Sequence, residues 1–377
     1  MNLDFSDDQK ALQDQVRRFL AERCTSAAVR RIVESDETHD RDLYAGLAEM
    51  GVLGAAIPEA YGGVGLSKLE LCLFAEELGR VIAPVPVSSS IYLAAEFLLL
   101  AGSEAQKTTW LPKLAAGEIV GTFALTEGSG RTTPDKVKAS VRNGRLTGTK
   151  VAVPDGAAAD LAVVAARHGT GEGADGISLY LVDLRGPGVE RTVLTTLDPS
   201  RKAATFTFKD APADLLGGEG DGWHVAGQVM DRAAILLAFE QVGGSDRALE
   251  MARDYALDRM AFGRPIGSFQ AIKHMLADMY VAATLARSNC YYAAWALSTD
   301  AAELPVAAAT ARVSATQSFQ HCAKNNIQTH GGMGFTWAFD CHLYYRRSNA
   351  LALSLGSLST WESLLIERLR GGNAAVA

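Results

Sequence analysis

The chain has 377 residues, of which 48% are hydrophobic and 21% are charged, and its net charge is −7. This balance is typical of a soluble globular protein and argues against a disordered or fibrous chain, and the dispersed charge argues against nucleic acid as a partner. The apolar runs are too short to cross a membrane and the first residues lack a secretory pattern, so we expect a cytoplasmic protein without membrane attachment.

Residues 1–118 are predicted to form a helical domain. Ser6 and Gln9 have the spacing of a capping box, and apolar residues follow it at helical intervals. Prolines and clustered glycines at 58–65 and 84–86 predict loops that separate the helices.

Residues 119–219 are predicted to form a small antiparallel sheet or barrel. The segments 161–165, 177–182 and 205–208 are short, rich in strand-forming residues and divided by glycines. The string Gly171-x-Gly-x-x-Gly176 matches a dinucleotide-binding pattern, but a strand-like segment follows it where that pattern requires a helix. We therefore interpret it as a glycine-rich turn between strands.

Residues 220–377 are predicted to form a helical bundle, with helices near 224–260, 268–299, 305–330, 341–354 and 359–370. Gly331 and Gly332 should end the third of these helices, Ser268 should cap the second, and Ser359 with Glu362 should cap the last. The five cysteines are scattered singly, which predicts reduced structural thiols and no metal site.

Three segments occur in an order and spacing that resemble the acyl-CoA dehydrogenases: Phe123–Glu127 (FALTE), Arg259–Gln270 (RMAFGRPIGSFQ) and Gln328–Gly334 (QTHGGMG). PEAYGGVG, LPKLAAGE and LTGTK extend the resemblance over nearly the whole chain. It implies an N-terminal helical domain, a central β-barrel domain and a C-terminal four-helix bundle. It also implies FAD, α,β-dehydrogenation of an acyl-CoA, an electron-transfer flavoprotein as acceptor, and a tetramer of identical or related subunits.

The resemblance implies roles for several residues in holding FAD. Arg259 would reach a phosphate, Gln270 would lie near the adenine end, and Phe262 would pack against the cofactor. The other half of the cofactor site would come from a neighbouring subunit and contain Gln328, Gly331 and Gly332. Leu125 and Thr126 would meet the flavin ring, although the chain departs from the family pattern directly after Glu127.

The usual catalytic base of the resembled family is missing. That base is a glutamate near the C-terminus, and Leu355 stands in its place. Some members carry the base on the long helix before the Arg259 motif, at a position that corresponds most closely to Ala234. Six residues later, Glu240 is the single ionisable side chain of an apolar stretch, and we expect it to be the base because buried carboxylates usually serve a purpose. The alternative is a structural carboxylate that pairs with an arginine such as Arg247 or with another subunit.

The remaining expectations concern the substrate and the reaction. Asp231 or Arg232 could hold the CoA or pantetheine, because the start of this helix lies near that site in the resembled family. His224 and His330 are given no role. Two alternative functions stay open: a non-catalytic subunit that completes a partner's site, and a flavin oxidase or monooxygenase on the same fold. Relatives acting on branched, cyclic or steroid side-chain thioesters belong to the same compact bacterial group.

Overall fold

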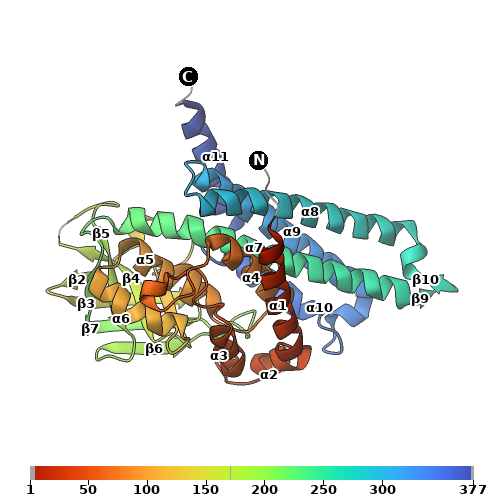
Figure 1. Ribbon diagram of the computed structural model, residues 1–377, viewed down its shortest axis with the longest axis horizontal. Helices are drawn as coiled ribbons and strands as arrows, with labels where there is room; N and C mark the ends of the chain where they lie inside the picture. Colours follow the sequence, from red (N-terminus) through yellow and green to blue (C-terminus); the bar gives the residue numbers. More distant parts are fainter. Residues whose placement is uncertain (1–4, 170, 375–377) are drawn as a thin grey trace. The chain divides into compact units, whose positions relative to one another are not determined.

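A computed structural model describes residues 5–169 and 171–374 (Figure 1). These residues separate into two compact units that both contain distant parts of the sequence. The helical unit comprises the described residues up to 30, residues 68–83 and the chain from 234 onward; the sheet unit comprises residues 31–67 and 84–233. The division into 1–118, 119–219 and 220–377 follows the sequence pattern and stays a prediction.

The sheet unit contains one eight-stranded sheet in the order β6-β7-β3-β2-β4-β5-β8, with β1 paired to β4. Most neighbours are antiparallel, but β1 and β2 both run parallel to β4, which the prediction of an antiparallel sheet missed. The strands are β1 (Gly121–Ala124), β2 (Ser140–Arg142), β3 (Arg145–Val153), β4 (Leu161–His168), β5 (Ile177–Asp183), β6 (Val189–Val193), β7 (Ala204–Pro212) and β8 (Asp214–Leu216).

The glycine-rich segment 171–176 lies in the turn between β4 and β5, as predicted. The backbone N–H of His168 donates to the carbonyl of Gly176, 3.1 Å away, which closes this turn. Short helices complete the sheet unit: α3 (Arg41–Glu49), η1 (Glu59–Tyr61), η2 (Ser88–Ala95), α5 (Glu96–Ala101), α6 (Glu104–Ala115) and η3 (Pro134–Lys136). Helix α2 (Ser26–Glu34) crosses the boundary between the units.

Long helices dominate the helical unit, and their bounds confirm the helices predicted for residues 220–377. Helix α7 begins in the sheet unit and continues into the helical unit from residue 234. The helices are α1 (Asp7–Arg23), α4 (Lys68–Arg80), α7 (Gly222–Asp258), α8 (Gln270–Ser298), α9 (Leu304–His330), α10 (Cys341–Leu353) and α11 (Leu358–Ala374). The short elements β9 (Met260–Ala261), β10 (Arg264–Pro265), η4 (Ile266–Ser268) and η5 (Gly331–Phe335) connect them.

Three predicted helix caps have different outcomes. The capping box at Ser6 and Gln9 is present at the start of α1. Ser268 does not cap α8, because its hydroxyl donates to the carbonyl of Pro265, 2.7 Å away. The cap of α11 is Ser357 rather than Ser359, since the hydroxyl oxygen of Ser357 accepts from the backbone N–H of Thr360 at 3.3 Å.

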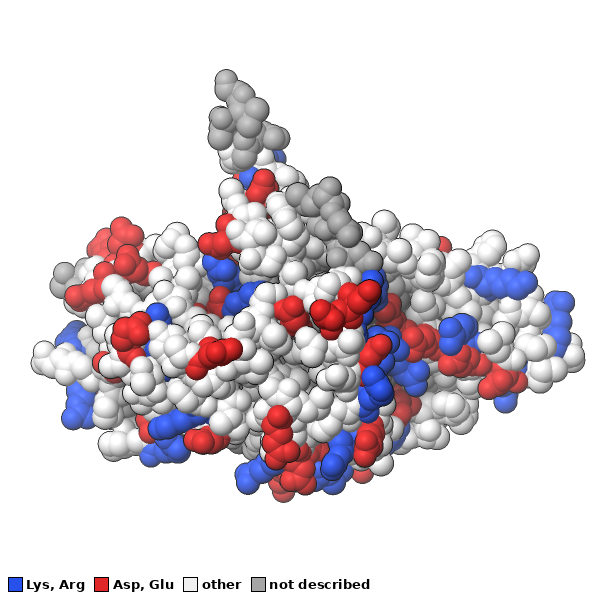
Figure 2. Space-filling view, viewed as in Figure 1, with Lys and Arg blue, Asp and Glu red and all other residues white. Residues whose placement is uncertain are grey.

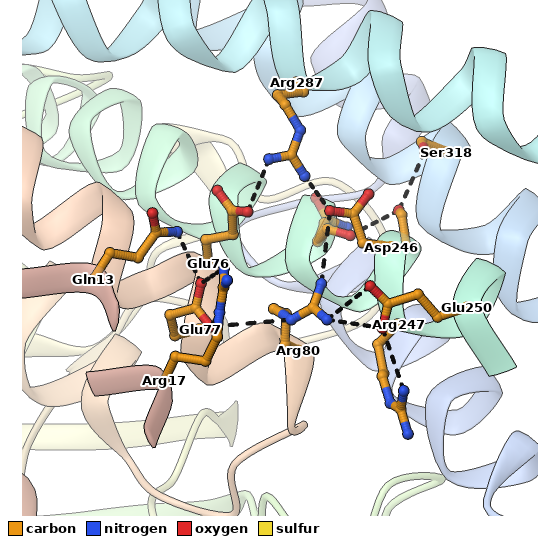
Figure 3. Close-up of polar contacts among 12 residues, drawn as sticks. Gln13, Arg17, Glu76, Glu77, Arg80, Asp246, Arg247, Glu250, Arg287 and Ser318 are labelled. Carbon is orange, nitrogen blue, oxygen red and sulfur yellow. Dashed lines mark hydrogen bonds and ion pairs between the residues drawn. The ribbon is translucent and has the colours of Figure 1, made fainter. Parts of the chain in front are cut away.

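A network of charged side chains connects α1, α4, α7 and α8 inside the helical unit (Figure 3). Arg287 of α8 donates to Glu76 of α4 at 2.9 Å and to Asp246 of α7. Arg80 of α4 reaches Glu250 of α7 at 2.8 Å. Burial raises the pKa of Glu76, and the positive charge of Arg287 opposes this rise. Because these charges are largely removed from water, the helices must keep their spacing to keep the charges paired.

All five cysteines are buried and free of disulfide bonds, as predicted. None of the helices in the described part of the chain is both long enough and apolar enough to cross a membrane. On the face drawn in Figure 2, basic and acidic side chains are interspersed, without an extended basic area.

Candidate active site

The hairpin after α7 presents two of the predicted cofactor residues to the surroundings. Strands β9 and β10 pair antiparallel across Phe262 and Gly263, whose φ angles of 52° and 80° form the tight turn. Phe262 is 95% exposed, and its ring lies in a T-shaped arrangement with that of Phe269 at a centroid distance of 6.1 Å. Arg259 at the start of the hairpin and Gln270 at the start of α8 are exposed as well.

The end of α9 carries Gln328, Gly331 and Gly332. Gln328 is exposed, and Gly331 has a φ of 59°, which favours glycine at this position. Gly332 does not have a positive φ angle that would favour glycine, and a Cβ added there would meet no atom within 4 Å. The described chain therefore does not itself require glycine at 332, whereas close approach by another molecule would require it.

Aromatic stacking brings these two segments to the same end of the helical unit. Tyr255 of α7 stacks on His330 of α9 with ring centroids 4.0 Å apart, and Phe339 contacts both rings. Burial lowers the pKa of His330, whose Nδ1 lies 2.9 Å from the carbonyl of Asn326. His330 is thus a packing residue, and the two segments that the sequence assigned to opposite halves of a cofactor site lie together on one chain.

Leu125 and Thr126 form a fixed loop after β1 in the sheet unit. The carbonyl of Thr126 accepts from the backbone N–H of Val151 at 2.8 Å, and the carbonyl of Leu125 accepts from the ammonium group of Lys150 at 3.0 Å. Lys150 also donates to the carboxylate of Glu127 at 2.6 Å. Lys150 was not among the residues predicted for the site, although a lysine within an otherwise strand-like segment is a signal for a buried, paired charge.

Leu355 packs in an apolar cluster with Ala234, Ala309 and Trp361. The two positions that the resemblance assigned to the base, Leu355 and most closely Ala234, thus pack against the same apolar side chains. Leu355 adopts a φ of 60°, and its carbonyl accepts from the indole N–H of Trp361 at 3.1 Å.

Glu240 is buried in α7, with only 3% of its surface exposed. Six residues along a helix advance about 9 Å and rotate by about 600°, which is about 240° beyond one full turn. Glu240 therefore faces a different side of α7 from Ala234. At this level α7 meets α4 so closely that a Cβ on Gly79 would lie 1.9 Å from the carbonyl oxygen of Glu240.

The arginine that interacts electrostatically with Glu240 is Arg312 of α9. Burial lowers the pKa of Arg312 to about 10, and the charge of Glu240 opposes this shift. The guanidinium donates to the side chain of Gln241 at 2.6 Å and to the carbonyls of Leu351 and Ser354. Arg247, the partner considered from the sequence, instead pairs with Glu250 at 3.3 Å.

Asp231 and Arg232 lie within α7, several residues after its first residue, Gly222, and not at its start. Asp231 is buried, and the Nε atom of Arg232 lies 3.8 Å from a carboxylate oxygen of Glu96. Within the described residues, no three His, Cys, Asp or Glu side chains gather as a metal site would require.

Comparison with known proteins decides the family. The family model "Acyl-CoA dehydrogenase, N-terminal domain" matches residues 6–118, and "Acyl-CoA dehydrogenase, C-terminal domain" matches residues 220–369. The chain is 32% identical to the acyl-CoA dehydrogenase IpdE2 of Mycobacterium tuberculosis, over 93% of this chain and 94% of the relative. It is 31% identical to an acyl-CoA dehydrogenase of Bacillus subtilis, over 97% and 98% of the two chains. The chain belongs to the acyl-CoA dehydrogenase family.

Solved structures of this family share the fold. One chain of the ChsE4-ChsE5 complex from Mycobacterium tuberculosis superposes with a TM-score of 0.89 and 28% identity, over 98% of this chain and 99% of that chain. Acyl-CoA dehydrogenases are FAD-dependent oxidoreductases, and the residues present fit that cofactor. An exposed cation, an exposed aromatic ring and an otherwise unexplained glycine are the groups that a pyrophosphate and a flat ring system require.

Proposed function

We propose that this chain works in the FAD-dependent α,β-dehydrogenation of an acyl-CoA thioester, which yields the 2-enoyl-CoA. The observation that carries this proposal is the end of the helical unit where Arg259, Phe262 and Gly332 lie exposed without a packing role. FAD held by these residues would supply the acceptor for the β-hydride, and an electron-transfer flavoprotein would take up the electrons.

Each cofactor residue has a physical role in this proposal. Arg259 would neutralise a phosphate, and Phe262 would cover a flat face of the cofactor. Gln270 would bond near the adenine, while the turn with Gln328, Gly331 and Gly332 would let the cofactor approach the backbone. Leu125 and Thr126 would contact the flavin ring from the sheet unit. Since Phe262 is 95% exposed on one chain, we infer that a second subunit completes this surface in a tetramer.

Asp231 and Arg232 are proposed to contact the CoA or pantetheine part of the substrate. Arg232 lies near the carboxylate of Glu96, so its guanidinium is partly neutralised before substrate arrives. This arrangement would favour a role in orienting the polar chain of pantetheine over one in binding a phosphate.

The base that removes the α-proton is proposed to come from a related subunit. The apolar cluster around Leu355 and Ala234 supports this, because a carboxylate at either position would have to enter an apolar surrounding. One relative, the ChsE4-ChsE5 complex, is an assembly of two different proteins. This chain would then be one half of a mixed tetramer.

Glu240 is the second candidate for the base, in a homotetramer. The supporting observation is that it is a buried carboxylate on α7, the helix that also carries Ala234. Its charge interacts with the buried Arg312 of α9.

Anaerobic flavin reduction by acyl-CoA tests both candidates. Native mass spectrometry of the purified chain first gives the number of subunits and FAD molecules. Glu240→Gln is then compared with the parent, because the amide is nearly isosteric but cannot take a proton. A base contributes about 100- to 10,000-fold to the rate, so a loss of that size with unchanged stability would identify Glu240 as the base.

The mixed-tetramer proposal expects a different result. The chain alone, loaded with FAD, should not be reduced by acyl-CoA, and Glu240→Gln should lower the thermal stability instead. Reduction should appear only after a base-carrying related subunit is added. Stoichiometric peroxide formation during turnover would contradict the dehydrogenase assignment itself and favour an oxidase.

A further inference from the structure

Lys150 of β3 is a lysine without any exposed side-chain surface. Removing an ammonium group from water costs several kcal/mol unless it is paired and hydrogen-bonded. Burial lowers the pKa of Lys150, and the carboxylate of Glu127 opposes this shift. The hydrogen bonds of this ammonium group therefore indicate what its burial contributes to the structure.

The contacts of Lys150 converge on one loop. Its Nζ atom donates to Glu127 Oε1 at 2.6 Å and to the carbonyl of Leu125 at 3.0 Å. Glu127 in turn accepts from the backbone N–H groups of Lys138 at 2.7 Å and Ala139 at 3.0 Å. A single salt bridge thus ties residues 125 and 127 to two other segments of the sheet unit.

Thr126, which lies between Leu125 and Glu127, is held by a backbone hydrogen bond from β3, the strand that carries Lys150. The backbone N–H of Val151 donates to the carbonyl of Thr126 at 2.8 Å. The hydroxyl of Thr126 has only a long contact of 3.4 Å with the hydroxyl of Thr132. The backbone of the loop is consequently fixed, while the Thr126 hydroxyl remains able to bond to a ligand.

We propose that Lys150 is a positioning residue for FAD, which with Glu127 holds the Leu125–Thr126 backbone in the conformation that meets the flavin ring. This inference rests on the proposed function. A loop that is already ordered before binding does not lose conformational freedom when the cofactor arrives, so affinity is gained without new contacts. Lys150 acts through the loop and need not touch the cofactor.

The first test is Lys150→Met, with Arg191→Met as the matched control. Arg191 of β6 is an exposed cation of the sheet unit, and it resembles Lys150 in donating to backbone carbonyls, those of Ala157 and Ala159. Lys150→Met should weaken FAD binding by at least about 10-fold and shift the visible absorption band of the bound flavin. Hydrogen exchange of the FAD-free chain should speed up at residues 125–127, and the control should leave all three readouts near the parent values.

The second test separates positioning from general stability. Lys150→Met leaves Glu127 as an uncompensated, largely buried charge, whereas the double variant with Glu127→Gln removes both charges. The double variant should recover thermal stability but keep the weak FAD binding and the fast exchange at residues 125–127. A purely structural salt bridge predicts that FAD binding returns together with stability.

The possible failures are distinguishable. If Lys150→Met keeps the parent's FAD affinity and amide protection, or if the double variant regains both, the positioning role is wrong. If the parent chain holds no FAD in any assembly, the proposed function fails, and the role of Lys150 fails with it.

Discussion

Arg312 shows how one buried side chain can determine the local structure at the end of a helix. Only 1% of its surface is exposed, yet its guanidinium bonds to the carbonyls of Leu351 and Ser354, where α10 ends before Leu355. The charge of Arg312 interacts with that of Glu240, which lies one residue before the hydrogen-bond partner Gln241. A buried carboxylate can therefore be retained to balance an arginine, without any role in catalysis.

A double-mutant cycle on Glu240 and Arg312 measures this relation. Arg312→Met should lower the free energy of unfolding by about 3–5 kcal/mol, because Glu240 and two carbonyls lose their cation. The double variant with Glu240→Gln should lose less than the sum of the single changes, with a coupling of about 0.5–3 kcal/mol in urea unfolding. Strictly additive losses would show that the two charges do not stabilise each other.

At the scale of elements, two glycines permit the close crossing of α4 and α7. A Cβ on Gly79 would lie 1.9 Å from the carbonyl oxygen of Glu240, and one on Gly243 would lie 1.9 Å from that of Glu76. The helix backbones themselves are thus in contact at both points. This spacing also sets the distances between the charged residues of Figure 3.

Gly79→Ala should force these helices apart and destabilise the protein by about 1–3 kcal/mol or more. Gly227→Ala is the matched control, since a Cβ at that position of α7 meets no atom within 4 Å. The control should be neutral or stabilising by about 0.4–1 kcal/mol, because alanine reduces the freedom of the unfolded chain. Equal thermal stability of the two variants would mean that α4 and α7 can separate without cost.

The sequence predicted the long helices well because helical periodicity is a local property, repeated many times along α7 to α11. It failed at the ends: Ser357 and Ser359 both suit a cap, and only the path of the turn decides between them. The parallel pairing of β1 and β2 with β4 depends on distant segments, as do the salt bridge of Lys150 and the electrostatic interaction of Arg312 with Glu240. Motifs predicted which residues would hold the cofactor, but the interaction of Glu240 with Arg312 could not be read from the neighbours of Glu240 in the sequence.

At the scale of the whole molecule, we expect FAD retention to depend on Arg259. Arg259→Ala should weaken FAD binding by about 1.5–3 kcal/mol through loss of a charge-assisted phosphate contact, measured by titration of the FAD-free protein. Arg264→Ala on the same hairpin is the control, because it removes the same charge from a side chain that packs over Phe269 at 4.2 Å. If both variants lose FAD equally, only the net charge of the hairpin matters; if neither does, the assignment of Arg259 is wrong.

The exposed ring of Phe262 has a consequence for the life of the protein in a cell. In a newly made chain that has folded but not assembled, this ring is exposed to solvent. Chaperones and proteases recognise exposed apolar surface of this kind. The amount of chain that survives would then depend on how soon flavin and a second subunit arrive. Cells that make the chain without its counterpart would be expected to degrade much of it, so that synthesis of the assembled subunits has to be balanced.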